Sequence, residues 1–260
     1  MIVVVGLNPA LDITHHVPQV DWAGVNRPTA VYARPGGKGT NVARTLHSFG
    51  VEILLLGFAG GTTGTAVETG LRELGVPTAF TPADGETRRT FTVVDGGGTA
   101  ALFNEPGPEI SAARFARFRS DYGRALAGAS AVTLSGSLPP GVPPTAYAQL
   151  IAASAESGVP VVLDAHGDAL RAGVTAGPAI VKPNLDELGE LSGRELVTPD
   201  GGVDWAGVTA AATALRTAGA RAVVVSLGRH GLLAVTEDGC WQARPAAVAE
   251  GNATGAGDAV

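Results

Sequence analysis

The chain has 260 residues, 45% hydrophobic and 16% charged, a composition typical of a globular protein with one large domain or two small ones. Its net charge of −6, with no cluster of Lys and Arg, argues against a nucleic-acid-binding protein. The 37 glycines follow no fixed period, which excludes solenoids and collagen.

Cys240 is the only cysteine, so no disulfide can form within the chain, and this fits a reducing compartment. No stretch of about 18 apolar residues occurs that would span a membrane. The apolar start at 2–5 meets Gly6 and Pro9 too soon for a signal peptide, and we interpret it as a buried strand. We therefore expect a soluble, cytoplasmic protein without nucleic-acid or membrane partners.

Short apolar runs recur along the chain and predict strands that are buried on both faces. They lie at 2–5, 51–56, 131–134, 159–163, 179–181 and 222–225. Helical patterns lie between them, at 41–49, 65–74, 112–126, 145–157, 185–191 and 205–217. This alternation predicts an α/β fold with a mostly parallel sheet, helices on both faces, and a ligand site beyond the carboxyl ends of the strands.

Two stretches break this alternation, and their strands look one-sided. Segments 12–17 and 31–34 flank a loop rich in Gly, Asn and Pro, whereas 87–94 and 100–104 flank three glycines and predict a β-hairpin. We expect these strands, near 12–34 and 87–104, to form a small projecting sheet that covers a site as a lid. Short strands within 231–250 predict an antiparallel edge, and the absence of a linker predicts one domain over 1–260.

Polar residues follow the first strand and precede the first helix. Asp12 is either an acceptor for substrate hydroxyls or a turn residue. The run Pro35-Gly36-Gly37-Lys38-Gly39-Thr40-Asn41 lacks Walker A spacing, but it places N–H groups, a lysine and an amide at a helix N-terminus. These groups suit a polyhydroxylated, anionic ligand, although a tight turn with a surface lysine is the alternative. Lys38 and Lys182 are the only lysines of the chain, which favours a function for Lys38.

Arg88 and Arg89 begin the predicted hairpin, and adjacent strand residues point to opposite faces, so only one of the two arginines can face the site. An arginine there suits a phosphate, but a solvated arginine is the alternative. Ser135 ends another predicted strand, in a stretch that is not a nucleophile elbow. The five histidines show no metal-ligand spacing, and we interpret them as surface or core residues.

Asn184 and Glu187 follow the strand that ends before Lys182, and their spacing serves either a capping box or water-mediated Mg²⁺ binding. Further on, Gly228 and Gly231 follow Ser226 and allow close approach of a nucleotide, with a plain hairpin turn as the alternative.

The last stretch, Gly251–Asp258, contains Thr254, Gly255, Ala256 and Gly257. If a helix opens here, its free N–H groups and dipole favour an anion such as a phosphate. Asp258 would then act as a base that deprotonates an attacking hydroxyl. The alternative is a glycine-rich loop in which the aspartate caps a helix.

Taken in order, these motifs resemble those of the ribokinase-like, or PfkB, family of sugar kinases, and most of all its 1-phosphofructokinase and tagatose-6-phosphate kinase branch. The resemblance covers the whole chain. It implies a three-layer α/β/α sandwich with a projecting β-sheet lid that often forms a dimer interface, so that a homodimer through the lid is expected. It also implies the cofactors ATP and Mg²⁺.

The resemblance further implies roles for individual residues. It assigns Asp258 as the catalytic base and Gly255–Gly257 as the anion hole. Substrate contacts are assigned to Asp12, Gly36, Gly37, Lys38, Asn41, Arg88 and Ser135, of which Lys38 and Arg88 meet the phosphate already on the sugar. Nucleotide contacts are assigned to Lys182, Asn184, Ser226, Gly228, Gly231 and Thr254. Glu187 is assigned to Mg²⁺ through water.

The hypothesis is therefore ATP-dependent phosphorylation of a phosphorylated ketohexose, with fructose 1-phosphate converted to fructose 1,6-bisphosphate first and tagatose 6-phosphate second. Family members normally continue past Asp258 through further helices that are missing after residue 260, so we expect this polypeptide to turn over poorly. The alternative is a non-catalytic sugar-phosphate-binding relative or an inactive fragment. A dinucleotide-dependent oxidoreductase is disfavoured, because no G-x-G-x-x-G follows the first strand.

Overall fold

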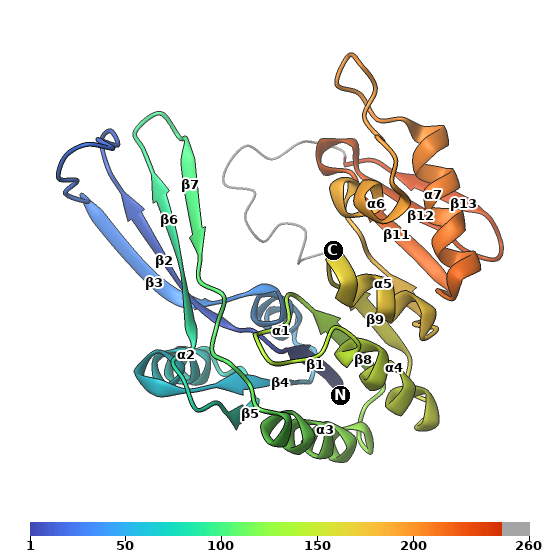
Figure 1. Ribbon diagram of the computed structural model, residues 1–260, viewed down its shortest axis with the longest axis horizontal. Coiled ribbons are helices and arrows are strands. Elements are labelled where there is room, and N and C mark those ends of the chain that lie inside the picture. The colour runs from blue at the N-terminus through green and yellow to red at the C-terminus, as the bar shows by residue number, and fades with distance from the viewer. Residues whose placement is uncertain (246–260) are drawn as a thin grey trace.

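The main sheet of the computed structural model, which describes residues 1–245, has nine strands (Figure 1). Across the sheet these are β13 (Cys240–Ala243), β12 (Leu232–Val235), β11 (Ala222–Ser226), β10 (Ile180–Val181), β9 (Val161–Asp164), β8 (Ala131–Ser135), β1 (Ile2–Gly6), β4 (Ile53–Ala59) and β5 (Thr78–Pro82). The pairs from β5 to β11 are parallel, and β12 and β13 are antiparallel. The predicted parallel sheet with an antiparallel edge is thus confirmed.

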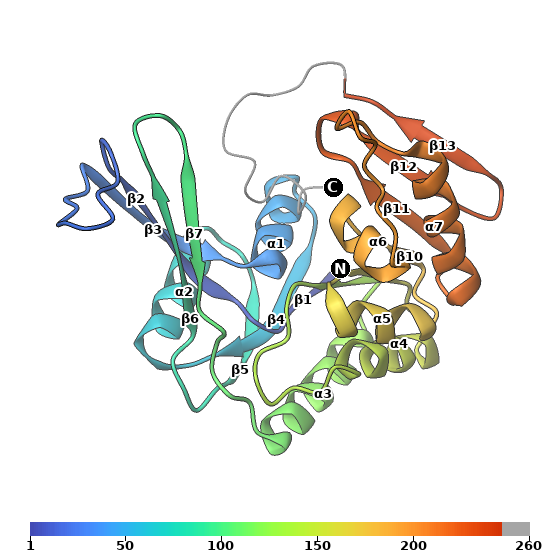
Figure 2. The same ribbon diagram turned by 45° about the horizontal axis from the view of Figure 1, so that its top comes forward.

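Helices cover both faces of this sheet, as Figure 2 shows. They are α1 (Lys38–Ser48), α2 (Gly61–Glu73), α3 (Ala112–Leu126), α4 (Ala146–Glu156), α5 (Gly167–Thr175), α6 (Leu185–Ser192) and α7 (Trp205–Ala218). Because strand side chains alternate between faces, Val4 packs in one core cluster with residues of α1 and α2, whereas Val3 and Val5 belong to the cluster that includes α3 and α4. This is the expected three-layer arrangement.

Two elements escaped the sequence patterns. Helix α5 is short, and its Gly173 lies against β9, where an added Cβ would be 2.5 Å from Leu163 Cδ2. Because this buried position holds a glycine, the apolar stripe that would indicate a helix is interrupted. Strand β5 lies at the sheet edge and ends in Pro82, which an edge strand tolerates. Within residues 1–245, every helix is too short or too polar to cross a membrane.

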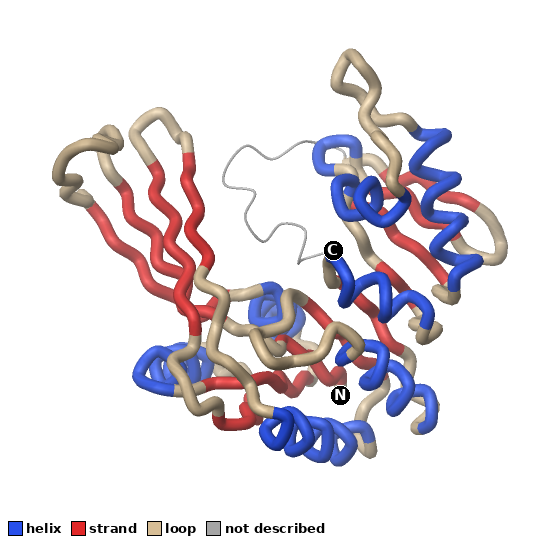
Figure 3. The backbone as a smooth tube through the Cα atoms, in the orientation of Figure 1, coloured by secondary structure: helices blue, strands red, loops and turns tan. Residues whose placement is uncertain are grey.

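The expected lid is a separate four-stranded sheet that projects from the main body (Figure 3). Its strands, in spatial order, are β3 (Ala30–Gly36), β2 (Ala10–His16), β6 (Arg88–Val94) and β7 (Ala100–Asn104). Strand β6 forms the predicted antiparallel hairpin with β7 and pairs in parallel with β2. Because β2 starts directly after β1, the base of the lid lies beside the carboxyl end of the main sheet.

Candidate active site

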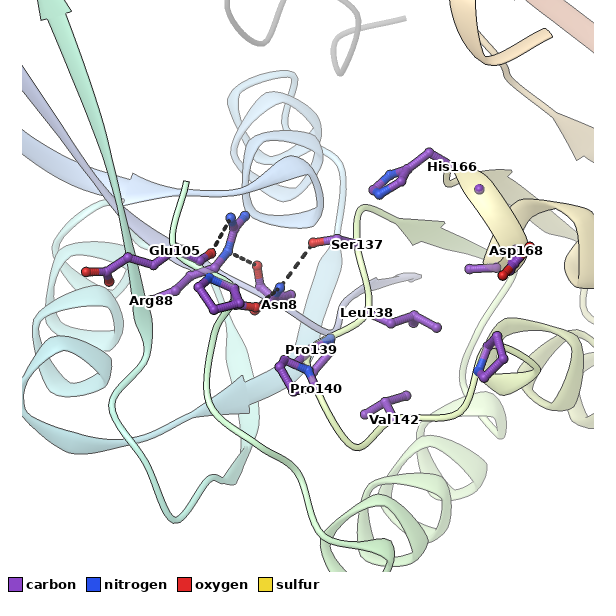
Figure 4. A pocket seen from close by; sticks show the side chains of 14 residues that line it. Asn8, Arg88, Glu105, Ser137, Leu138, Pro139, Pro140, Val142, His166 and Asp168 are labelled. Carbon is purple, nitrogen blue, oxygen red and sulfur yellow. Dashed lines mark hydrogen bonds between the residues drawn. The ribbon is translucent and has the colours of Figure 1, made fainter. Parts of the chain in front are cut away.

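A cavity of about 350 Å³, here called the central cavity, lies where the base of the lid meets the carboxyl ends of β1 and β8. It is lined by Gly6, Asn8, Pro9, Gly37, Lys38, Gly39, Arg88, Asn104, Ser135, Gly136, Ser137 and His166. An adjoining groove of about 500 Å³ shares Asn8, Arg88, Ser137 and His166 with it (Figure 4). The site therefore lies at the edge of the sheet that the sequence predicted.

The N-terminus of α1 reaches this cavity because glycines allow backbones to touch. An added Cβ on Gly39 would lie 2.5 Å from the Cα of Gly6, so the helix rests directly on the end of β1. Gly37 is the N-cap of α1, with φ of 88°, a conformation that favours glycine. The helix begins at Lys38, three residues before the predicted helical pattern of 41–49.

Asp12 lies on β2 with its carboxylate over Gly36, where an added Cβ would be 2.0 Å from Asp12 Cγ. Its Oδ1 accepts a hydrogen bond of 2.5 Å from Thr90 Oγ1 on the neighbouring β6. The glycine at position 36 is therefore required by the carboxylate beside it. The pair occupies the base of the lid, and neither residue lines the central cavity.

Arg88 is the arginine that faces the cavity. Its Nε donates to the carbonyl oxygen of Asn8 at 3.1 Å and its Nη1 to that of Glu105 at 3.4 Å. Burial lowers the pKa of Arg88, while the carboxylates of Asp12 and Glu105 raise it. Arg89 is exposed and pairs with Glu105 at 2.8 Å. The alternation along β6 thus separates the two arginines, as the sequence predicted.

The two lysines of the chain converge on one buried carboxylate. Lys38 Nζ lies 2.8 Å from Oδ1 of Asp164, and Lys182 Nζ lies 2.9 Å from Oδ2 of the same residue. Glu187 Oε1 is 3.3 Å from Lys38 Nζ. Asp164 was not among the predicted site residues. Its place at the end of β9, a buried parallel strand, is the signal that would have found it.

Ser135 and Gly136 form the wall of the cavity opposite the lid. Ser135 ends β8 and is buried, and the turn at Gly136 has a φ of 99°. An added Cβ on Gly136 would lie 3.3 Å from the Cβ of Lys38, so this turn leaves room for the lysine stem. Asn8 closes the floor by donating to Ser137 Oγ at 3.1 Å and to the Pro106 carbonyl at 3.0 Å.

His166 also lines the central cavity, as the N-cap residue of α5. The sequence treated all five histidines as surface or core residues, and an exposed histidine at a cavity wall was missed. The only signal was its position two residues after the end of β9. No group of three or more possible metal ligands occurs among residues 1–245.

Asn184 and Glu187 form the capping box of α6. Asn184 Oδ1 accepts from the Glu187 N–H at 2.8 Å, and Glu187 Oε2 accepts from the Asn184 N–H at 2.9 Å. The other oxygen of Glu187 faces Lys38. The side-chain oxygens of Asn184 and Glu187 therefore already have partners. They suit a cation that keeps its own water shell, and they suit less well a cation that needs direct ligands.

Of the residues assigned to the nucleotide, those within 1–245 follow β10 or lie at and beyond the end of β11. Asn184 and Ser226 form an isolated parallel bridge, so the two loops run side by side. Gly228 has a φ of 54° and open space where a Cβ would be, whereas a Cβ on Gly231 would lie 2.0 Å from the Ala243 carbonyl oxygen. Open space beside Gly228 is available to a ligand, while Gly231 also serves packing on β13.

Asn41 lies on the wall of a different cavity, of about 510 Å³, along the side of α1. This separates it from the residues that line the central cavity. Thr254, Gly255, Ala256, Gly257 and Asp258 lie outside the described residues.

Comparison with known proteins points to a single family. The model of the pfkB family of carbohydrate kinases matches residues 1–260. The 1-phosphofructokinase of Bacillus subtilis (strain 168) is 35% identical over 100% of this chain and 83% of its own length. That of Escherichia coli (strain K12) is 34% identical over 98% of this chain and 80% of its own length.

The fold is similar as well. The crystal structure of phosphofructokinase-2 from Escherichia coli in complex with fructose-6-phosphate matches with a TM-score of 0.87 and 34% identity. That match covers 100% of this chain and 83% of the other.

Proposed function

The chain belongs to the pfkB family of carbohydrate kinases, and from this premise we propose that it transfers the γ-phosphoryl group of ATP to a fructose phosphate. Fructose 1-phosphate, converted to fructose 1,6-bisphosphate, is the first candidate, because the two curated relatives described above are 1-phosphofructokinases. Tagatose 6-phosphate is the second candidate, from the resemblance of the motifs.

One observation supports a phosphorylated substrate most directly: Arg88 from the lid and Lys38 from α1 line the same cavity of about 350 Å³. Lys38 is already paired with two carboxylates, whereas the hydrogen bonds of Arg88 go to backbone carbonyl oxygens. Arg88 is therefore the cation of this cavity that most favours a ligand with negative charge. Arg88 binds the phosphate already on the sugar in this proposal, and Asp12 accepts hydrogen bonds from the sugar hydroxyls, with Gly36 and Gly37 beside it. The family motifs also assign Asn41 to the sugar, but its position on a separate cavity does not support that role.

The nucleotide binds on the other side of Lys38. Kinases of this family use ATP. Lys182 and Asn184 face its phosphates in this proposal, next to the loop of Ser226 and Gly228. Gly231 and Thr254 complete the set that the family motifs suggest. The bridge between Asn184 and Ser226 supports a common role for these two loops.

In the proposed reaction, Asp258 takes the proton from the sugar hydroxyl, and that oxygen attacks the γ-phosphorus in line. The backbone N–H groups of Gly255, Ala256 and Gly257 stabilise the negative charge that develops on the phosphoryl oxygens. These assignments rest on the family motif.

Mg²⁺ would screen the charge of the transferring phosphoryl group. The carboxylates of Glu187 and Asp164 would hold it only through its waters, since each is already paired with a lysine. Ser135, at the end of β8, lies near the acceptor in this proposal.

A homodimer through the lid is part of the proposal. Exposed apolar side chains lie on one face of the lid, including Val31 at 54% and Phe103 at 50% exposure, which the register of the four strands places on the same side of the sheet. A monomeric protein rarely leaves such side chains together in water. The alternative function, a non-catalytic sugar-phosphate-binding protein, would keep the lid and the Asp12 site without turnover.

The test is a coupled kinase assay with Mg-ATP against fructose 1-phosphate, tagatose 6-phosphate, fructose 6-phosphate and free fructose. It uses this chain and, in parallel, any longer natural form. We expect the highest kcat/KM for fructose 1-phosphate and little activity with free fructose. Binding of sugar phosphates by calorimetry without turnover of any of them by either form would support the binding protein instead.

A further inference from the structure

The cavity on the side of α1 is distinct from the central cavity and has a different character. It has a volume of about 510 Å³ and is lined by Arg34, Asn41, Arg44, Thr45, His47, Ser48, Leu74 and Val76. None of these residues lines the central cavity or its adjoining groove. Two arginines and a histidine face it and no acidic residue does, in a chain whose net charge is −6.

Its lining comes from three segments. Asn41, Arg44, Thr45 and Ser48 have the i, i+3, i+4 and i+7 spacing of one helix face. Arg34 comes from β3 of the lid, and Leu74 and Val76 come from the turn between α2 and β5. A solvated polar face of α1 alone would not bring a second arginine from the lid into the same cavity.

Arg34 and Arg44 lie near enough to repel each other electrostatically. Burial lowers the pKa of Arg44, the nearby Arg34 lowers it further, and only Asp12 acts in the opposite direction. Arg44 donates to the Pro35 carbonyl at 3.3 Å, whereas the side chain of Arg34 has no hydrogen bond or ion pair with any residue in 1–245. Asp12 offsets the repulsion between the two arginines only in part, and an anion between them would relieve the rest.

We propose that this cavity is a second anion site, which binds a phosphate group through Arg34 and Arg44 with His47 and the Thr45 hydroxyl as further polar partners. Guanidinium groups match phosphate because each can donate two parallel hydrogen bonds. The cavity runs towards the C-terminal end of α1, where the helix dipole disfavours anions, so the side chains must supply the affinity. Leu74 and Val76 add an apolar wall.

Two structural connections join this site to the candidate active site, so that binding at one can affect the other. Arg34 is paired with Asp12 in the β2–β3 register, and Asn41 and Lys38 belong to the same helix. The ligand would be free phosphate or a small phosphate monoester. The site does not depend on the proposed reaction.

The test is calorimetric titration of the full chain with inorganic phosphate at constant ionic strength. The Arg34→Gln/Arg44→Gln double variant should lose this binding. Arg34→Gln alone should weaken it about tenfold, since hydrogen bonds to charged groups contribute strongly. The single variant removes an exposed side chain without described partners, so it should keep the fold, which circular dichroism and Tm verify.

Two further variants separate this site from others. Arg171→Gln, an exposed arginine on α5, should bind phosphate as the parent does. Arg88→Gln should keep this binding, because Arg88 lines the central cavity. Unchanged phosphate binding by the double variant, loss of all binding in Arg88→Gln, or no binding by the parent chain would each overturn the proposal.

A parallel titration with glycerol 3-phosphate distinguishes the two sources of the phosphate group. Tighter binding than that of inorganic phosphate assigns the site to phosphate esters, and weaker binding assigns it to the free anion. Both outcomes require that the Arg34→Gln/Arg44→Gln variant loses the signal. Because the readout is binding and not turnover, it stays valid if the chain phosphorylates no sugar.

Discussion

Lys38 and Asp164 are 126 positions apart in the sequence, yet Nζ of the lysine lies 2.8 Å from Oδ1 of the aspartate. The other oxygen of Asp164 faces Lys182 at 2.9 Å. The aspartate is almost fully buried, so its charge needs both partners. One carboxylate thereby fixes the two lysines of the chain on either side of the same point, at the carboxyl end of β9.

Replacement of Asp164 by asparagine should therefore destabilise the fold. It keeps the shape but leaves two partly buried ammonium groups without their shared counter-charge, at a cost of about 1–3 kcal/mol. Urea unfolding measures this free energy. Asp84→Asn is the control, since its pair with Arg114 is solvent-exposed and should contribute little. A similar loss of stability in both variants would contradict this account.

Arg88→Gln should raise the KM for the sugar phosphate by about tenfold or more, with the KM for ATP unchanged, because a charged hydrogen bond to phosphate is lost. Steady-state kinetics with each substrate varied in turn separates the two constants. Arg89→Gln is the matched control, because this neighbouring arginine points outward and pairs with Glu105. An effect of equal size in both variants would remove the assignment of Arg88.

Gly36→Ala should abolish sugar binding, because the new Cβ would lie 2.0 Å from Asp12 Cγ and force the carboxylate away. Calorimetric titration with the sugar phosphate measures the loss. Gly123→Ala should leave binding unchanged and raise the unfolding free energy by about 1 kcal/mol, because this exposed position in α3 has no atom within 4 Å of the added Cβ. If Gly36→Ala bound the sugar phosphate with normal affinity, the position of the Asp12 carboxylate would not be required for sugar binding.

The carboxylate of Glu86 makes part of the unfolding free energy depend on pH. Its carboxylate accepts hydrogen bonds from the backbone N–H groups of Thr63 and Thr62 at the start of α2, and these lower its pKa from 4.5 to about 2. A lowered pKa means that the contribution is full above pH 4.5 and is lost as the pH falls towards about 2.

Glu86→Gln should therefore be less stable than the parent chain at pH 7, and the difference should shrink between pH 4.5 and 2. Urea unfolding across this pH range measures it. Glu73→Gln, an exposed residue of the same helix, is the control. A gap between parent and variant that is the same at pH 7 and pH 2.5 would refute the role of Glu86.

Asp258→Asn should remove nearly all turnover while it leaves sugar binding largely intact, since a general base acts on the transition state more than on the bound substrate. The coupled assay measures turnover, and calorimetry measures sugar affinity. If Asp258→Asn retained turnover, the assignment of Asp258 as the base would be contradicted.

Local patterns were sufficient for most of the fold. Apolar runs identified β1 and β8, and the helical periodicity of α3 placed both of its ends correctly, because a buried strand and an amphipathic helix each leave a signature within a few residues. The short α5 was missed because Gly173 replaces an apolar residue where the helix touches β9.

The candidate site divides in the same way. From the sequence alone came the glycine turn before α1, the choice of one arginine at the start of β6, and the capping box of Asn184 and Glu187, since each depends on neighbours within a few positions. Only the tertiary structure decided that Asp164 joins Lys38 to Lys182, that His166 lines the cavity, and that Arg34 meets Arg44 beside α1. Those contacts form between side chains on different elements, and their positions follow from how strands and helices pack, which no local pattern of residues encodes.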